Sequence, residues 1–350
     1  MRYKLLGKSG LRVSELCLGT MTFGDDWGWG SSKEESREVY DAFVEAGGNF
    51  IDTADLYTNG TSESFLGEFI ASDRERIVLA TKYTNTAPGT DPNAGGNQRK
   101  NMMQSVEASL KRLKTDYIDL YWLHVWDFTT PVEEVMRAFD DLVRQGKVLY
   151  IGISDAPAWI VAQANMLAEL RGWTPFVGLQ IEYSLIERTS ERELLPMARE
   201  LDLGVTAWSP LAGGLLTGKY ASSGHSGGEE KRLQHPMMAP LVDINERKQA
   251  ITTAVVQIAE AIDKTPAQVA LNWLRQQSGV VIPIIGARRL SQLKDNLACV
   301  EFSLDEEKLR RLNDVSQIEL GFPHDFFTNE LVQNFVFGGM RDFIDNHRMR

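Results

Sequence analysis

The segment Phe50-Ile51-Asp52-Thr53-Ala54 is a short, largely apolar run that begins shortly after Gly47-Gly48, a pair typical of a helix end. Seven further runs of five to seven residues are built in the same way, and none alternates strictly between apolar and polar residues. Continuous apolar runs of this length are typical of parallel strands buried on both faces. In chain order the eight runs span residues 16–20, 50–54, 77–82, 118–124, 150–154, 177–183, 205–210 and 280–285.

Helical patterns lie between these runs. Residues 32–46 begin with a serine and carry a glutamate three positions later, which is the signature of a capping box. Eight strand–helix units without a break in composition predict an α/β fold, a closed (β/α)8 TIM barrel. The alternative of two doubly wound domains is disfavoured because no Pro/Gly-rich linker lies near the middle of the chain. Further helices are predicted at residues 62–71, 99–113, 131–144, 158–171, 190–201, 244–263, 266–277 and 305–315.

The last part of the chain differs from the rest in composition. We predict that residues 1–316 form the barrel and that residues 317–350 form a C-terminal extension. The extension is too aromatic for a disordered segment, so we expect it to pack on the barrel, with an oligomer contact as the alternative. Its aromatic residues are Phe322, Phe326, Phe327, Phe335, Phe337 and Phe343.

Composition limits the classes of partner. The 350 residues carry 37 Lys and Arg against 48 Asp and Glu, a formal charge of −11, which argues against binding to nucleic acid or to an anionic membrane surface. The two cysteines, Cys17 and Cys299, have no pairing pattern and indicate a reducing compartment. No secretory signal and no apolar run long enough to span a membrane is visible, so we expect a cytoplasmic protein.

Polar residues stand where several predicted strands end. Asp52 and Lys82 would each cost several kcal/mol in an apolar strand unless paired with each other or with a ligand. A buried ion pair that only fixes the barrel is one interpretation. The other interpretation is a catalytic set that also includes Tyr57 and His124. In such a set the lysine ammonium should lower the pKa of the nearby phenol, the aspartate keeps the lysine charged, and the histidine shares a substrate oxygen. Such a set would protonate a carbonyl oxygen as hydride arrives at its carbon.

These residues lie in motifs that resemble the aldo-keto reductase superfamily. The motifs are Asn49-Phe50-Ile51-Asp52-Thr53-Ala54-Asp55-Leu56-Tyr57, Thr81-Lys82, Asp119-Leu120-Tyr121-Trp122-Leu123-His124 and Trp208-Ser209-Pro210-Leu211. The resemblance runs from about residue 3 to residue 315. It implies that residues 3–14 form a β-hairpin that caps the bottom of the barrel.

The resemblance also implies a catalytic tetrad of Asp52, Tyr57, Lys82 and His124, with Tyr57 as the general acid. Members of the family bind NADPH in an extended form across the barrel top, and NADH remains possible here. The positions that match the family's cofactor contacts are Gly19, Thr20, Met21, Asp52, Ser154, Asp155, Gln180, Trp208, Ser209, Pro210, Leu211, Gly213, Lys219, Gly286, Arg288, Gln292 and Asn296.

Physical chemistry supports several of these positions. Gly213 allows the backbone to approach a diphosphate closely, and Lys219 adds a local cation to an acidic protein. Arg288 could fork onto a ribose 2′-phosphate, which favours NADPH over NADH. Asp155 departs from the asparagine of many relatives. A carboxylate at this position can accept from the nicotinamide NH₂ but cannot donate to the carboxamide oxygen.

We expect the substrate to be a small aldehyde or ketone held near Tyr57 and His124, with Trp27 and Trp126 as aromatic walls. No metal site is expected, because the histidines lack metal-ligand spacing. No Gly-x-Gly-x-x-Gly follows the first strand, so a Rossmann cofactor site is unsupported. A regulatory subunit that binds the nicotinamide cofactor with little turnover is the alternative function, although the presence of His124 favours an enzyme. The oligomeric state stays open.

Overall fold

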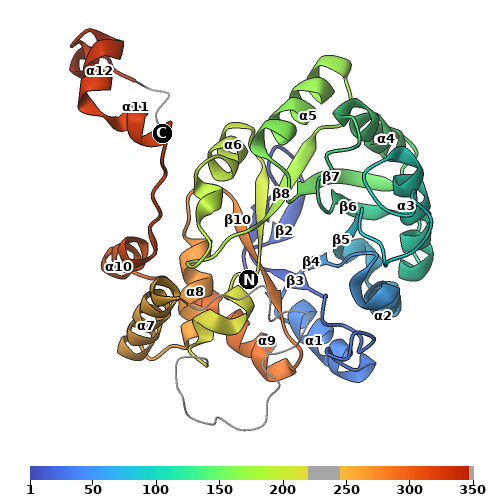
Figure 1. The fold of residues 1–350 in the computed structure, drawn as a ribbon. Coiled ribbons are helices and arrows are strands. Elements are labelled where there is room, and N and C mark those ends of the chain that lie inside the picture. Colours follow the sequence, from blue (N-terminus) through green and yellow to red (C-terminus); the bar gives the residue numbers. More distant parts are fainter. Residues whose placement is uncertain (220–244, 347–350) are drawn as a thin grey trace.

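The computed structural model describes residues 1–219 and 245–346. Eight parallel strands form a closed barrel in the order β10-β3-β4-β5-β6-β7-β8-β9 (Figure 1). All eight predicted runs are found as strands of this barrel, and the two-domain alternative is wrong. The strands are β3 (Cys17–Gly19), β4 (Phe50–Asp52), β5 (Val78–Tyr83), β6 (Ile118–Leu123), β7 (Val148–Ser154), β8 (Phe176–Glu182), β9 (Gly204–Trp208) and β10 (Val281–Gly286).

Helices surround the barrel (Figure 1). The predicted capping box at the start of α1 is present, since the Ser32 hydroxyl accepts from the Glu35 amide and the Glu35 carboxylate accepts from the Ser32 amide. The helices are α1 (Lys33–Glu45), α2 (Thr61–Phe69), α3 (Arg99–Leu113), α4 (Val132–Arg144), α5 (Ala158–Arg171), α6 (Leu194–Glu200), α7 (Glu246–Ala261), α8 (Pro266–Arg275), α9 (Leu290–Leu297), α10 (Glu306–Ser316), α11 (His324–Thr328) and α12 (Glu330–Phe337).

Short 3-10 turns complete the element list. Two of them, η1 (Tyr57–Gly60) and η5 (Ala212–Thr217), follow strands β4 and β9 and carry predicted site residues. The others are η2 (Ile70–Ser72), η3 (Arg74–Arg76), η4 (Thr189–Glu191), η8 (Ala298–Glu301) and η9 (Arg341–Phe343).

The barrel interior is filled by side chains and closed at one end by the hairpin of β1 (Tyr3–Leu5) and β2 (Arg12–Ser14). Trp122 is fully buried there. A Cβ on Gly152 would lie 2.3 Å from the Trp122 ring, and one on Gly178 would lie 2.7 Å from it, so these two glycines make room for the indole. Leu6 and Val13 belong to the same interior cluster. The packed interior leaves the carboxyl ends of the strands as the place for chemistry.

The C-terminal extension differs from our expectation. None of residues 317–346 is buried, and Figure 1 shows α11 and α12 (red) standing apart from the barrel beyond an extended segment. Two polar contacts hold the root of the extension: the Arg192 guanidinium donates to the Glu319 carbonyl at 2.9 Å, and His324 lies 3.3 Å from the Glu193 carboxylate. These contacts fix the root beside η4 and α6 without burying the phenylalanines.

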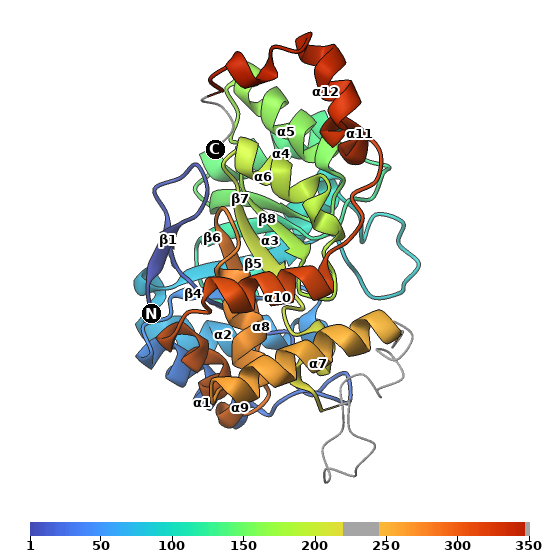
Figure 2. The ribbon, with the colours of Figure 1, turned by 90° about the vertical axis from the view of Figure 1, so that its left-hand side faces the viewer.

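Figure 2 shows α11 and α12 at the end of the molecule where α5 and α6 lie. Within residues 1–219 and 245–346, no helix combines the length and the apolar character needed to cross a membrane.

Candidate active site

Two opposite charges are buried side by side at the carboxyl ends of β4 and β5. Lys82 is fully buried and Asp52 is 2% exposed. The Lys82 ammonium donates to the Asp52 carboxylate, to the Thr53 carbonyl at 2.8 Å and to the Tyr57 hydroxyl at 3.2 Å. The second oxygen of the Asp52 carboxylate accepts from the Gln180 amide at 3.0 Å. The structure therefore joins three members of the predicted tetrad in one hydrogen-bonded chain.

The backbone after Tyr57 turns sharply and fixes where the phenol points. Thr58 and Asn59 have φ of 47° and 56°, and Gly60 has φ of 92°, so three successive residues adopt the left-handed conformation. The Thr58 hydroxyl donates to the Phe23 carbonyl at 2.7 Å and holds this turn against the loop after β3. Left-handed backbone at non-glycine residues costs free energy and is often found where a side chain must be held for function.

His124, the fourth member, follows the last residue of β6. Its ring centroid lies 5.9 Å from that of Tyr57, with the two planes at 79°. The backbone N–H of His124 donates to the Tyr83 carbonyl at 3.1 Å, which continues the barrel ladder. Its Nδ1 atom is buried and has no hydrogen-bond partner among the residues that the structure describes. Burial, together with the Lys82 ammonium, lowers the pKa of His124 to about 3, so the imidazole is neutral at physiological pH.

The electrostatics of the phenol correct one prediction. Burial raises the pKa of Tyr57 above its ordinary value, and the opposing effect of the Lys82 ammonium does not overcome it. The predicted net lowering of this pKa is therefore wrong, because desolvation of a phenolate outweighs one nearby cation. Burial by itself would lower the pKa of Lys82, but the Asp52 carboxylate and the Tyr57 phenol raise it. At neutral pH, Tyr57 thus carries its proton and Lys82 its charge.

Three predicted cofactor residues end neighbouring strands. Ser154, Gln180 and Trp208 are at the carboxyl ends of β7, β8 and β9, and Ser154 pairs directly with Gln180 in the sheet. The Trp208 indole N–H donates to the Asp155 carboxylate at 3.0 Å. The Asp155 carboxylate therefore orients the indole. The Ser154 hydroxyl and the Gln180 amide beside the flat ring of Trp208 fit a nicotinamide ring with its carboxamide.

The loop after β9 has the backbone that the predicted diphosphate site needs. It contains a run of left-handed residues, and the exposed side of such a turn presents backbone N–H groups. Pro210 is buried and Leu211 packs against the core, so the loop is attached firmly to the barrel. Lys219 follows directly after Gly218, at the edge of the described residues. The left-handed residues are Ser209, Ala212, Gly213, Gly214 and Gly218.

Arg288, Gln292 and Asn296 follow β10 and are spaced four residues apart, which puts them on one side of α9 and its entry. The Gln292 side chain accepts from the Arg288 amide at 3.0 Å. Asn296 is buried. Gly286 ends β10 in an exposed position where a Cβ would have no close neighbour. Packing therefore does not require glycine at this position.

The predicted residues after β3 serve the barrel as well. A Cβ on Gly19 would lie 2.6 Å from a methyl group of Ile284, so packing between β3 and β10 requires glycine there. The Thr20 hydroxyl donates to the Asp52 carbonyl at 3.1 Å and is buried. Met21 is the next residue and is half-buried at the same rim.

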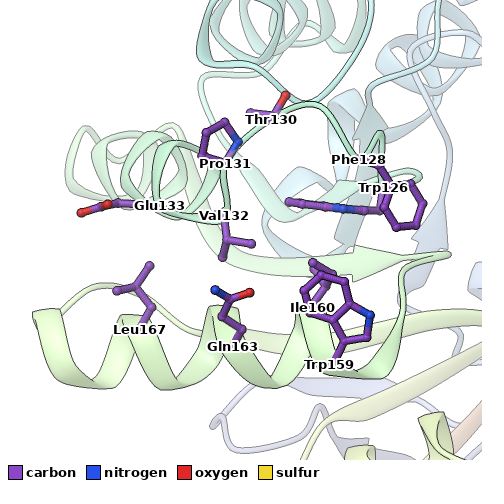
Figure 3. A pocket seen from close by; sticks show the side chains of 10 residues that line it. All are labelled: Trp126, Phe128, Thr130, Pro131, Val132, Glu133, Trp159, Ile160, Gln163 and Leu167. Carbon is purple, nitrogen blue, oxygen red and sulfur yellow. The ribbon is translucent and has the colours of Figure 1, made fainter.

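The two predicted aromatic walls lie in different places. The ring of Trp27 is 6.5 Å from the ring of Tyr57 with the planes at 80°, beside the tetrad. Trp126 instead lines an apolar groove of about 480 Å³ between α4 and α5 (Figure 3). The backbone N–H of Trp126 donates to the Asp155 carbonyl at 3.3 Å. This bond connects the groove to a residue that is predicted to contact the cofactor.

Sequence reasoning missed a second layer of polar residues behind the tetrad. Glu63 of α2 is fully buried, accepts from the Thr81 hydroxyl at 2.6 Å and pairs with Arg112 at 2.6 Å. The capping and spacing rules give no signal for these contacts, because the partners lie on three different elements. Burial, with Glu63 nearby, raises the pKa of Asp55 to about 7. This layer supports the loop that carries Tyr57.

Comparison with known proteins gives consistent results. A sequence model described as the aldo/keto reductase family matches residues 15–317. Norsolorinic acid reductase of Aspergillus flavus is 38% identical over 341 residues, which cover 95% of this chain and 85% of the relative. An aryl-alcohol dehydrogenase [NADP(+)] of Phanerodontia chrysosporium is 38% identical over 344 residues, covering 93% and 89%. The uncharacterized oxidoreductase YrpG of Bacillus subtilis is 41% identical over 327 residues, covering 90% and 96%.

The match spans the whole barrel, from before β3 to the end of α10. It includes every strand end at which the structure gathers the predicted tetrad, and the relatives are similar over nearly their full length. The chain is an oxidoreductase and belongs to the aldo/keto reductase family.

Proposed function

We propose that this protein reduces aldehyde or ketone carbonyls to alcohols with NADPH, and that Tyr57 is the general acid. The observation that carries the proposal is the contact of 3.2 Å between the Lys82 ammonium and the Tyr57 hydroxyl, with the Asp52 carboxylate behind the ammonium. A half-buried phenol beside a permanent cation is a proton donor whose conjugate base is stabilised as it forms.

Each tetrad member has one part in this proposal. Tyr57 gives its proton to the carbonyl oxygen as negative charge develops there. Lys82 stabilises the phenolate that remains, and Asp52 keeps Lys82 charged and oriented. Neutral His124 offers a hydrogen bond to the same oxygen, because the lowered pKa prevents it from adding a second positive charge. Bound NADPH would supply the hydride that reaches the carbonyl carbon.

The residues that would hold the cofactor come from five strand ends. Ser154 and Gln180 would bind the carboxamide, and Trp208 would stack on the nicotinamide ring. The loop of residues 209–219 would receive the diphosphate, and Arg288 the 2′-phosphate, with Gln292 and Asn296 at the adenosine end. A guanidinium that forks onto a phosphate gives the preference for NADPH over NADH.

The substrate class that we propose is an aryl aldehyde or ketone. Trp27 stands edge-on to the Tyr57 ring and offers an apolar wall beside the proton donor. One relative is named for its action on aryl alcohols, which are aromatic, and another is named for the reduction of norsolorinic acid. We place the reaction in the cytoplasm, where two free, buried cysteines suit a reducing environment.

The test has two parts. NADPH should quench the tryptophan fluorescence of the protein, and the NADPH absorbance should fall when benzaldehyde, a substituted benzaldehyde or acetophenone is added. NADH in the same assays should bind more weakly by about tenfold, as expected for one lost charge-assisted contact. Quenching without NADPH consumption over the whole panel would instead favour the cofactor-binding regulatory subunit. Absence of quenching would contradict the cofactor assignment itself.

A further inference from the structure

The extension exposes an amount of apolar surface that is unusual for a molecule that remains single in water. Phe322, Phe335 and Phe343 are 84%, 77% and 79% exposed. At about 200 Å² for each fully exposed ring, the six phenylalanines of the extension leave roughly 800 Å² of surface in contact with water. The largest apolar patch on a typical monomer is about 300–600 Å².

This area agrees with what one partner buries in a stable protein–protein interface, about 800 Å². The apolar residues also lie on an ordered element. α11 packs against α12, and Asn329 caps α12 by accepting from the Leu331 amide at 3.0 Å. The extension therefore contains two consecutive helices whose apolar side chains are exposed.

The same chain carries a concave apolar surface of its own. The groove between α4 and α5 opens beside Phe128, which is 70% exposed, and Trp159, which is 62% exposed. In Figure 3 the side chain of Val132 points down from α4 toward Gln163 on α5, and Leu167 and Trp159 lie on either side of Gln163. Its apolar lining residues are Trp126, Phe128, Val132, Trp159, Ile160 and Leu167.

The polar contacts at the root decide whose groove the extension occupies. The bonds from Arg192 to Glu319 and from His324 to Glu193 hold the beginning of the extension on η4 and α6, and α11 and α12 project away from their own barrel (Figure 1). Each molecule thus presents one projecting apolar helix pair and one open apolar groove. Two copies related by a two-fold axis can satisfy both surfaces of both molecules at once.

We propose that the extension of one molecule docks through α11 and α12 into the α4–α5 groove of a second copy, and that the exchange is reciprocal. A helix that lays its apolar face into a groove is a common recognition mode. The docked helices would contact Trp126, whose backbone N–H donates to the Asp155 carbonyl. The partner's extension would therefore lie close to Asp155, one of the residues expected to bind the cofactor.

Molar mass in solution tests the proposal. The full chain at micromolar concentration should be a dimer or a multiple of one by light scattering. Phe326→Asp with Phe335→Asp on the extension, and separately Trp159→Asp in the groove, should each shift the mass toward the monomer. Leu149→Asp, at an apolar residue that is 43% exposed at the start of β7, is the control and should leave the mass unchanged. Circular dichroism verifies that each variant is folded.

Each contrary result overturns a defined part of the proposal. A monomeric full chain contradicts the dimer. A tail variant that remains dimeric removes the extension from the interface. A Trp159→Asp protein that remains dimeric removes the groove.

Cross-linking distinguishes a second copy from the molecule's own barrel. One protein would carry Phe335→Cys and another Gln163→Cys, and the native Cys17 and Cys299 are both fully buried. Mild oxidation of the mixture should give a cross-linked species of twice the mass in greater yield than either variant oxidised alone, because only docking of the extension into the groove of a second molecule brings the two different cysteines together. A chain carrying both changes that closes a disulfide at monomer mass, with none in the mixture, would show that the extension folds back on its own groove and would overturn the proposal.

Discussion

The tetrad rim and the C-terminal extension both place side chains where folding alone disfavours them, but in opposite senses. At the rim, Lys82 and Asp52 carry charge in a site almost without exposure. In the extension, Phe322 and Phe335 expose most of their apolar surface. The first arrangement costs desolvation free energy, and the second leaves unused the free energy of apolar burial.

The difference lies in how each cost is met. The buried charges at the rim are paired within the chain, since Lys82 has three acceptors and Asp52 has two donors. The exposed phenylalanines of the extension gain little such compensation from their own barrel. The charges of Lys82 and Asp52 are thus compensated within one molecule, whereas the extension leaves apolar surface for the partner that we propose.

The largest effect is expected when the compensation at the rim is removed. Lys82→Met leaves the Asp52 carboxylate buried without its cation and should destabilise the protein by about 3–5 kcal/mol. Urea unfolding measures this loss. Lys33→Met is the control, because the ion pair of Lys33 with Glu68 is exposed and should contribute no more than about 1 kcal/mol. Equal losses in the two variants would show that the rim pair is not special.

A double variant sharpens the same point. Asp52→Asn combined with Lys82→Met removes both charges, so most of the stability lost in Lys82→Met should return while turnover stays absent. If stability does not return, the loss comes from packing rather than from an uncompensated carboxylate.

The pH dependence of stability tests the environment of His124. Its native pKa of about 3 lies below the unfolded value of 6.5, so the native state binds fewer protons in this range and stability falls as the pH falls through it. Between pH 6.5 and pH 5 this contributes up to about 2 kcal/mol. His124→Gln should lose less stability over this interval than the unaltered protein. Identical pH profiles would mean that His124 is solvated in the native state.

A smaller effect is expected at the cofactor's far end. Arg288→Ala should weaken NADPH binding by about tenfold and leave NADH binding unchanged, because only the 2′-phosphate would contact the guanidinium. Fluorescence titration with both cofactors measures this ratio. Arg289→Ala is the neighbouring control. A loss of affinity shared by NADPH and NADH would assign Arg288 to another part of the dinucleotide.

The smallest effect is expected from Asp155→Asn. The side-chain oxygen of asparagine can still accept from the Trp208 indole, so the hydrogen bond at 3.0 Å should survive with lower strength. We expect a change of no more than about threefold in the KM for NADPH. Asp155→Ala removes the acceptor and should have the greater effect. If the two variants behave alike, the bond to Trp208 does not orient the indole.

The sequence predicts the barrel well because both-face burial makes parallel strands continuous apolar runs, and eight of them leave few alternatives. The pairing of Asp52 with Lys82 is also foreseeable, since two opposite charges at neighbouring strand ends must meet or remain uncompensated. The motifs at residues 49–57 and 119–124 identify the family without any knowledge of geometry.

Other features depend on distances that no sequence spacing encodes. Gln180 donates to Asp52 across 128 positions only because the closed barrel brings β8 opposite β4. The net pKa of Tyr57 follows from the extent of its burial, which the motif does not report. The place of the extension was missed because composition shows that its residues are apolar, but not that they are left exposed beyond the polar contacts at its root.

The central claim is that Tyr57 delivers the proton, and Tyr57→Phe tests it most directly. The variant keeps the ring beside His124 and Trp27 but removes the hydroxyl that contacts Lys82. Single-turnover oxidation of NADPH by an aryl aldehyde should slow by about 10²-fold or more, while the fluorescence Kd for NADPH stays within about twofold of the unaltered protein. An unchanged rate of turnover in Tyr57→Phe would contradict the account.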